Sequence, residues 1–208
     1  MARRRPHHRR SRPERTVRHE IRIVGGEHRS RRLVYQLEPG TRPMKNRTRE
    51  AIFNLLGRPD RDVWGLDLFA GTGAMAFEAL SRGAGAALCV ERHRPTAKQI
   101  VAAAERLGLA DRLQVVAQDV FRWWDLMGDS PSLPQDRPWW VFCCPPYRLL
   151  HEAPERIDEL LRQLKQRLPP ASWLVLEADE AFSSDRLPPG DWDRRAYPPA
   201  VVYLCRKD

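Results

Sequence analysis

A glycine-containing loop and two acidic residues are the strongest chemical signals in the sequence. The loop, Asp67-Leu68-Phe69-Ala70-Gly71-Thr72-Gly73, follows an apolar run that predicts a β-strand. Glycines at this position let the backbone turn sharply and approach a ligand at the start of the next helix. Glu91 ends the second predicted strand and Asp119 follows the third. A carboxylate at Glu91 would bind ribose hydroxyls, and one at Asp119 would accept from an adenine amino group. The pattern predicts a nucleoside-containing cofactor.

The loop sequence alone does not distinguish between two classes of cofactor. Extended to Ala76, it fits the loose pattern G-x-G-x-x-A, which serves dinucleotides such as NAD as well as S-adenosylmethionine. Glu91 and Asp119 also have a simpler interpretation, as a helix cap or a solvated loop residue.

The residues at the end of the fourth predicted strand favour S-adenosylmethionine over NAD. These residues, Cys144-Pro145-Pro146-Tyr147, resemble the Asp/Asn-Pro-Pro-Tyr/Phe motif of amino-directed, S-adenosylmethionine-dependent methyltransferases. With the loop, they make the chain from about residue 20 similar to the bacterial RsmD-type methyltransferases, which act on guanine N2 of small-subunit rRNA. Three further stretches carry the resemblance, at residues 22–26, at 41–43 leading to 47–54, and at 77–84.

The resemblance implies an α/β fold of the Rossmann-like class I S-adenosylmethionine-dependent methyltransferases. This fold has a seven-stranded, mostly parallel sheet, a C-terminal antiparallel hairpin and a small N-terminal β-hairpin/helix extension. The implied activity is transfer of a methyl group from S-adenosylmethionine to the exocyclic amino group of a guanine in 16S rRNA. The base must leave its stacked position to enter such a site.

The resemblance also assigns roles to individual residues. The cofactor would be held by Asp67, Phe69, Ala70, Gly71, Thr72, Gly73, Glu91, Arg92 and Asp119. The target base would be surrounded by Cys144, Pro145, Pro146 and Tyr147, with the aromatic ring stacked on the base. RNA would be contacted by Arg22, Arg29, Arg31, Arg32, Arg42, Arg47 and Arg49.

The chain departs from the family at Cys144, where the motif has Asp or Asn. A thiol is a weak hydrogen-bond acceptor, and losing such a bond costs about 1 to 3 kcal/mol, or roughly 5- to 150-fold in rate. Two alternatives therefore stay open. The chain could be a catalytically degenerate methyltransferase fold that acts as an rRNA-binding or ribosome-assembly factor. It could also methylate an amino group of another nucleic-acid base.

Alternation of short apolar runs with helical periods predicts βαβ units and a parallel sheet from residue 63 onward. Strands are predicted at 63–69, 86–91, 113–117, 139–144 and 172–176, and helices at 74–82, 95–107, 120–127 and 153–168. Two further strands, at 192–197 and 201–205, have only Pro198-Pro199 between them and predict an antiparallel hairpin. Trp123, Trp124, Trp139 and Trp140 are predicted to pack in or beside the core.

The N-terminal part divides into an arm and an extension. Residues 1–18 are rich in Arg, His and Pro and predict a disordered basic arm. Strands at 19–24 and 31–37 around a glycine turn, and a helix from Arg47 to Leu56 capped by Asn46, predict an RNA-binding extension over 19–57. Residues 58–208 would form the methyltransferase domain.

Charge is concentrated in the N-terminal part. Residues 1–57 hold 16 basic and 5 acidic side chains, a net charge of +11, whereas the remainder has a net charge of −2. Such an arginine-rich end indicates a nucleic-acid partner, here small-subunit rRNA or the assembling small ribosomal subunit. No apolar run reaches the roughly 20 residues of a membrane span. The four cysteines, Cys89, Cys143, Cys144 and Cys205, lack the spacing of a metal site, so we expect no metal. We also expect a cytoplasmic location and a monomer.

Overall fold

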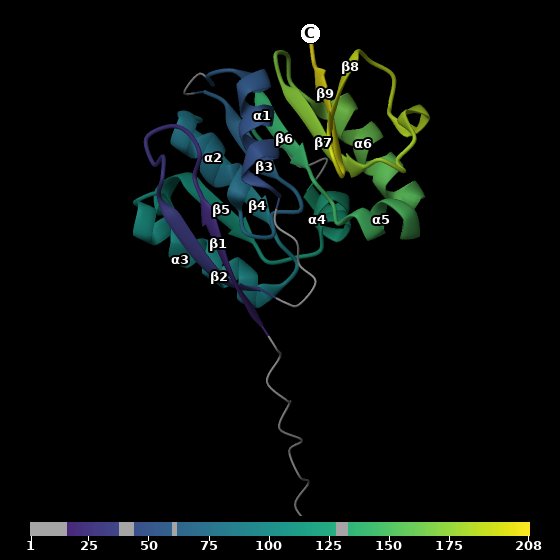
Figure 1. The fold of residues 1–208 in the computed structure, drawn as a ribbon. Helices are drawn as coiled ribbons and strands as arrows, with labels where there is room; N and C mark the ends of the chain where they lie inside the picture. Colours follow the sequence, from purple (N-terminus) through teal and green to yellow (C-terminus); the bar gives the residue numbers. More distant parts are fainter. Residues whose placement is uncertain (1–15, 38–43, 60–61, 128–132) are drawn as a thin grey trace, which may run out of the picture.

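The computed structural model describes residues 16–37, 44–59, 62–127 and 133–208, and a seven-stranded sheet lies at its centre (Figure 1). The strand order is β5-β4-β3-β6-β7-β9-β8. Five neighbouring strands run parallel: β3 (Trp64–Asp67), β4 (Ala86–Val90), β5 (Leu113–Val116), β6 (Trp139–Cys143) and β7 (Trp173–Asp179). The antiparallel strands β9 (Ala200–Arg206) and β8 (Trp192–Tyr197) complete the sheet. The predicted mostly parallel sheet and C-terminal hairpin are confirmed.

Helices cover both faces of this sheet. One face carries α4 (Val120–Met127), α5 (Tyr147–Glu152) and α6 (Pro154–Arg167), which share an apolar cluster with Leu66 and Val141. The opposite face carries α1 (Asn46–Leu56), α2 (Ala74–Arg82) and α3 (Arg94–Leu107), which pack in clusters with Cys89 and Phe142. Because both faces are covered, β3 and β6 are buried along their whole length, which explains the apolar sequence of β6 and of β3 up to Asp67.

The four tryptophans that flank or enter the fourth predicted strand belong to the core. Trp123, Trp124, Trp139 and Trp140 are all at most 4% exposed. Their predicted packing role is confirmed, and none of them is available to stack on a nucleobase.

A two-stranded antiparallel sheet, β1 (Val17–Arg22) and β2 (Arg32–Leu37), packs beside α2 and α3. Its turn docks on the end of α2, where the Glu27 N–H donates to the Ser81 carbonyl at 2.7 Å and the His28 N–H donates to Ser81 Oγ at 2.9 Å. Gly26 has a φ of +75°, and a Cβ there would lie 1.9 Å from the Ser81 carbonyl oxygen. Only glycine allows this close approach.

Two local predictions were wrong, and one short helix was missed. Helix α1 begins at Asn46 with Lys45 at its N-cap position, so Asn46 is not the cap, and its Oδ1 instead accepts from Arg49 Nη2 at 2.8 Å. The helix predicted over 153–168 is confirmed as α6 (Pro154–Arg167), but the short α5 (Tyr147–Glu152) that precedes it was not predicted. Val17 and Arg18 belong to β1, and residues 1–15 of the predicted arm lie outside the described residues.

Within the described ranges, no helix is long and apolar enough to cross a membrane. Among the same residues, no group of three or more His, Cys, Asp and Glu side chains is arranged to hold a metal ion.

Candidate functional site

The carboxyl ends of the parallel strands meet at one edge of the sheet, which we call the carboxyl edge. Strand β3 pairs with β4 on one side and β6 on the other, so Asp67 at the end of β3, Glu91 directly after β4 and Cys144 directly after β6 come together there. Ligands of open α/β sheets bind at this edge, next to the strand where the chain order reverses. The topology therefore gathers three of the predicted site residues.

The glycine loop is fixed by Glu91. The Gly71 N–H donates to Glu91 Oε2 at 2.8 Å, and the His93 N–H donates to Glu91 Oε1 at 2.7 Å. A Cβ on Gly73, whose φ is +70°, would lie 3.1 Å from Ile100, whereas a Cβ on Gly71 would meet only the Phe69 carbonyl oxygen at 4.0 Å. Gly73 is thus needed for packing, and Gly71 leaves open space beside the loop.

Asp67 is a buried carboxylate without a cationic partner. It is 1% exposed, its Oδ2 accepts from the Ala76 N–H at 3.3 Å, and it forms no ion pair within the described part of the chain. Burial raises its pKa from 3.8 to about 7, and the negative charge of Glu91 adds to the increase. Burial also raises the pKa of Glu91, which backbone donors partly offset. Two carboxylates whose ionised forms are costly favour a positively charged ligand.

Asp119 has the simpler of its two predicted roles in this structure. Its side chain is exposed, and Oδ1 accepts from the N–H groups of Phe121 at 3.1 Å and Arg122 at 3.2 Å, in the first turn of α4. This is helix capping. Phe121 also packs edge-on against Phe69 of the glycine loop, with ring centroids 6.1 Å apart, so the capped helix supports the loop.

The Cys144-Pro145-Pro146-Tyr147 motif joins β6 to α5. The Pro146 carbonyl accepts from the Leu149 N–H at 2.8 Å and is thereby engaged in starting α5. Pro145 is buried at the end of the strand. Tyr147 is half-buried and begins α5.

Sequence reasoning missed Glu177 on β7, which lies beside this motif. Tyr147 Oη donates to Glu177 Oε1 at 3.2 Å. Burial raises the pKa of the Cys144 thiol well above its ordinary value, and the charges of Glu177 and Asp67 raise it further. Cys144 is therefore a neutral thiol placed between two carboxylates, which is unsuited to nucleophilic chemistry.

The predicted RNA-contacting arginines fall into three groups. Arg42 lies outside the described residues. Five are exposed, namely Arg22, Arg29, Arg31, Arg32 and Arg47. Arg49 is a correction, because it is 1% exposed, its Nε lies 3.6 Å from Glu78 Oε2, and its Nη2 donates to the Arg22 carbonyl at 2.5 Å. In this position Arg49 joins α1 to α2 and does not face a ligand.

The two ends of the β1–β2 hairpin lie at different edges of the sheet. Its turn, which carries Arg29 and Arg31, docks at the end of α2, and α2 runs away from the carboxyl edge. The start of β1 pairs with Leu37 of β2, whose neighbour Gln36 bonds Gln99 in the N-terminal half of α3. Since α3 begins after β4, the described chain starts at the same end of the molecule as the carboxyl edge, the lower end in Figure 1.

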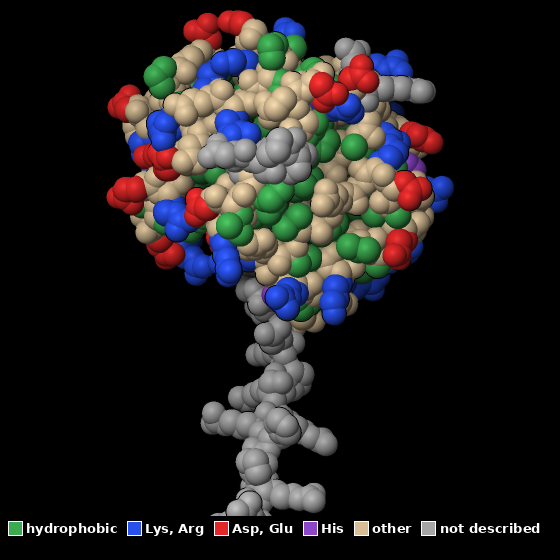
Figure 2. Space-filling view, turned by 180° about the vertical axis from the view of Figure 1, so that it is seen from behind, with side chains coloured by type: hydrophobic (Ala, Val, Ile, Leu, Met, Phe, Trp, Pro, Cys, Tyr) green, Lys and Arg blue, Asp and Glu red, His purple; other side chains and the backbone are tan. Residues whose placement is uncertain are grey.

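Exposed cations that sequence reasoning left unassigned follow the ends of these strands. Arg94 opens α3, Arg122 lies in the first turn of α4 and Arg148 in that of α5, and Arg92, predicted to bind cofactor, is also exposed. Figure 2 shows Lys and Arg side chains along the rim where the described chain begins. We call Arg92, Arg94, Arg122 and Arg148 the basic rim.

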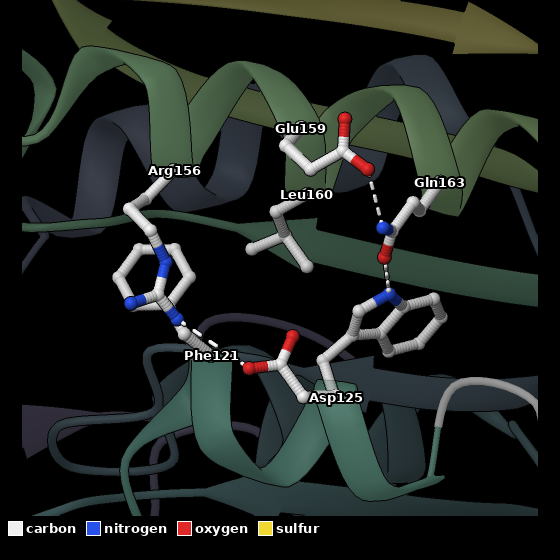
Figure 3. Close-up of a pocket in the computed structure, with 7 residues that line it drawn as sticks. Phe121, Asp125, Arg156, Glu159, Leu160 and Gln163 are labelled. Atoms are coloured by element: carbon white, nitrogen blue, oxygen red, sulfur yellow. Dashed lines mark hydrogen bonds and ion pairs between the residues drawn. The ribbon is translucent and has the colours of Figure 1, made fainter.

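Two cavities lie apart from the carboxylates of the carboxyl edge. One, of about 30 Å³, lies between α4 and α6, where Arg156 stacks on Phe121, Arg156 pairs with Asp125, and Trp124 donates to Gln163 (Figure 3). It has room for a water molecule only. The other is an open groove of about 320 Å³ between α3 and β5, which includes Arg94 and Lys98. Neither cavity contains the carboxylates of the carboxyl edge.

Comparison with known proteins relates the chain to one family. The family model described as "Conserved hypothetical protein 95" matches residues 21–193. "Ribosomal RNA small subunit methyltransferase D" of Escherichia coli K12 is 44% identical over 82 residues, covering 39% of this chain and 41% of that protein. The Haemophilus influenzae protein of the same name is 32% identical over 131 residues, covering 62% of this chain and 64% of that protein. Each match thus spans less than two thirds of the relative.

Among solved structures, one described as a putative methyltransferase yhhF from Escherichia coli superposes with a TM-score of 0.70 at 25% identity. That alignment covers 91% of this chain and 99% of the other. The predicted class I methyltransferase fold is confirmed.

Proposed function

Because this chain belongs to the family described as conserved hypothetical protein 95, we propose that it is an S-adenosylmethionine-dependent rRNA methyltransferase. Its substrate would be the exocyclic amino group of a guanine in small-subunit rRNA, as free RNA or in the assembling subunit. The observation that carries the proposal is the row of Asp67, Glu91 and Cys144 at the carboxyl edge, because it puts a cation-attracting site next to the Pro-Pro-Tyr motif.

The residues fit this cofactor. S-adenosylmethionine is positively charged at its sulfonium and ammonium groups, and Asp67 is a buried carboxylate that lacks a cation. Its ribose hydroxyls match the free lone pairs of Glu91 beside the open space at Gly71. Ala70, Thr72 and Gly73 belong to the loop, and Phe69 of the loop packs on Phe121 of α4. Arg92 is exposed at the rim, and Asp119, which caps α4, would accept from the adenine amino group. When bound, the cofactor supplies the methyl group.

The rest of the chemistry is positioning by this chain. Tyr147 offers an aromatic face at the start of α5, and the Pro145 carbonyl is an acceptor for an amino group. An amino nitrogen held by acceptors directs its lone pair away from them, which favours in-line attack without a covalent enzyme intermediate. Exposed cations of the basic rim and of the residues 19–57 extension would bind RNA phosphates.

A methyl-transfer assay tests the proposal. The full chain is incubated with S-adenosylmethionine carrying a labelled methyl group and with small ribosomal subunits or free 16S rRNA, and the modified nucleotide is mapped by mass spectrometry. We expect label on guanine N2, and calorimetry should detect S-adenosylmethionine binding that Asp67→Asn and Gly71→Val both weaken. Cofactor and RNA binding without transfer would instead favour the degenerate rRNA-binding factor.

We further propose that the protein acts as a monomer in the cytoplasm without a metal ion. Light scattering after size exclusion and activity in the presence of a chelator test the first and last of these statements. A dimer or chelator-sensitive activity would contradict them.

A further inference from the structure

The inference concerns the hydrogen-bond acceptor that the motif lacks at Cys144, and it rests on the proposed function. We propose that Glu177 is the catalytic side chain that accepts a hydrogen bond from the target amino group, in place of the Asp or Asn that Cys144 replaces. Glu177 comes from a neighbouring strand and from outside the motif.

The register of the sheet places the two residues side by side. In the parallel pair β6–β7, Cys143 is opposite Leu176, so the next position brings Cys144 opposite Glu177. Side chains of a strand alternate between faces. Phe142 and Val175, two positions earlier, lie in the same apolar cluster, and Cys144 packs against that cluster. Cys144 and Glu177 therefore point to the same face at the carboxyl edge.

Contacts confirm that the Glu177 carboxylate faces the motif. Its Oε1 accepts from Tyr147 Oη at 3.2 Å, and its charge acts on the Cys144 thiol. The bond to Tyr147 fixes the carboxylate while leaving further lone pairs on both oxygens. Glu177 is half-buried, so a ligand at the edge can reach it.

The other carboxylates near this edge are less suitable acceptors. Asp67 accepts from the Ala76 N–H beside the glycine loop and is assigned to the cofactor in the proposed function. Asp179, two positions further along β7, bonds His151 Nε2 through Oδ2 at 2.7 Å, and its charge is not among those that act on the Cys144 thiol. Glu177 is thus the carboxylate that combines access with contact to both Tyr147 and Cys144.

Chemically, a carboxylate is a stronger acceptor than a thiol and matches the Asp of the family motif. The Pro145 carbonyl and Glu177 together would supply two acceptors for the two hydrogens of the amino group. A loss of one such bond is expected to lower the rate about 10- to 100-fold.

The first test is binding and does not require turnover. Guanosine and inosine differ by the 2-amino group, and their affinities for the full chain are measured by ligand-observed NMR in the presence of S-adenosylhomocysteine. We expect wild type to prefer guanosine about 5- to 20-fold and Glu177→Met to bind both equally. Glu177→Gln, which keeps an acceptor oxygen, should retain most of the preference. Equal affinities in wild type, or an unchanged preference in Glu177→Met, would overturn the inference.

The second test is a double-mutant cycle on methyl transfer to small ribosomal subunits. We expect Glu177→Met to lower kcat about 10- to 100-fold when Cys144 is present. In a Cys144→Asn background the same substitution should lower kcat less than about threefold, because the introduced amide oxygen supplies the acceptor. Equal costs in both backgrounds would contradict the inference. Glu180→Met, an exposed position just after β7, is the matched control for a change of charge.

The two tests distinguish a failure of the Glu177 role from a failure of the proposed function. A guanosine preference that depends on Glu177, without methyl transfer to any RNA, would count against the enzyme and support the acceptor. Methyl transfer at a rate that does not change when Glu177 is replaced would support the enzyme and count against Glu177 as the acceptor.

Discussion

At the scale of single residues, Asp67 determines the electrostatics of the candidate site. Its pKa is 3.8 in an exposed setting and about 7 in the fold, because burial penalises the charged form. Between these values the folded chain keeps a proton that the unfolded chain has released, so the free energy of unfolding should fall as pH rises from about 4 to about 7.

Asp67→Asn tests this dependence. Asn keeps an oxygen for the Ala76 N–H and carries no charge, so we expect a variant that is more stable than wild type at pH 8 by about 1 to 4 kcal/mol. Urea denaturation at pH 5 and pH 8 without ligand measures the difference. Asp119→Asn, at an exposed position, is the control. A wild type whose stability rises with pH over this interval would show that Asp67 is ionised at little cost.

Arg47 and Arg49 form a second residue-scale comparison. Both are in the first turn of α1, but Arg47 is exposed and Arg49 is buried against Glu78. Arg49→Met should lower the free energy of unfolding by about 3 kcal/mol, because a buried ion pair is broken. Arg47→Met should leave stability within about 0.5 kcal/mol and weaken rRNA binding. Denaturant titration and filter binding check both, and equal stability of the two variants would contradict the burial of Arg49.

At the scale of secondary-structure elements, much of the fold could be predicted, because buried parallel strands have long apolar runs. Helices at 74–82 and 120–127 have the predicted bounds. The helix predicted over 153–168 is α6, whose start is marked by the first-turn Pro154. The six-residue α5 was missed, because so short a segment shows no clear helical period. The predicted roles of the site residues remain predictions.

Long-range contacts explain what the sequence did not reveal. Arg49 lies at helical spacing with the buried Ile52 and Phe53 on α1, but the carboxylate that pairs with it, Glu78, is 29 positions away on α2. Glu177 ends an apolar run and resembles a solvated strand end. Only the register of β6 against β7 brings it to Cys144 and Tyr147. The helical spacing could have placed Arg49 on the buried face, but neither its pairing with Glu78 nor the position of Glu177 has a local sequence signal.

The contact of the β1–β2 turn with α2 gives an element-scale prediction. Gly26→Ala would place a Cβ 1.9 Å from the Ser81 carbonyl oxygen at a φ of +75°, so the turn must move off α2. We expect a loss of about 2 to 4 kcal/mol and faster amide exchange at Glu27 and His28. Gly108→Ala, at a φ of +68° with open space around it, should cost only about 1 kcal/mol. Equal losses of stability in the two variants would mean that backbone strain alone, and not the contact with Ser81, determines the cost of each substitution.

At the scale of the whole molecule, the arrangement of charge predicts where RNA binds. The basic rim surrounds the carboxyl edge, whereas Arg29 and Arg31 lie at the turn docked on the far end of α2. Reversing two charges at the rim, in Arg92→Glu/Arg94→Glu, should weaken binding of small-subunit rRNA at least about tenfold and reduce its salt dependence. Arg29→Glu/Arg31→Glu makes the same change in net charge and should have a smaller effect. The reverse order would place the RNA over the hairpin turn.

The uncompensated carboxylate of Asp67 also has a consequence for the lifetime of the protein in a cell. A cationic ligand that relieves this charge binds the folded state alone and raises its population by mass action. Proteases act on transiently opened chains, so the ligand-free form should be degraded faster than the occupied form. Pulse proteolysis at increasing concentrations of S-adenosylmethionine should then show a rising amount of surviving protein, and an amount that does not change would mean that the folded state gains nothing from this ligand.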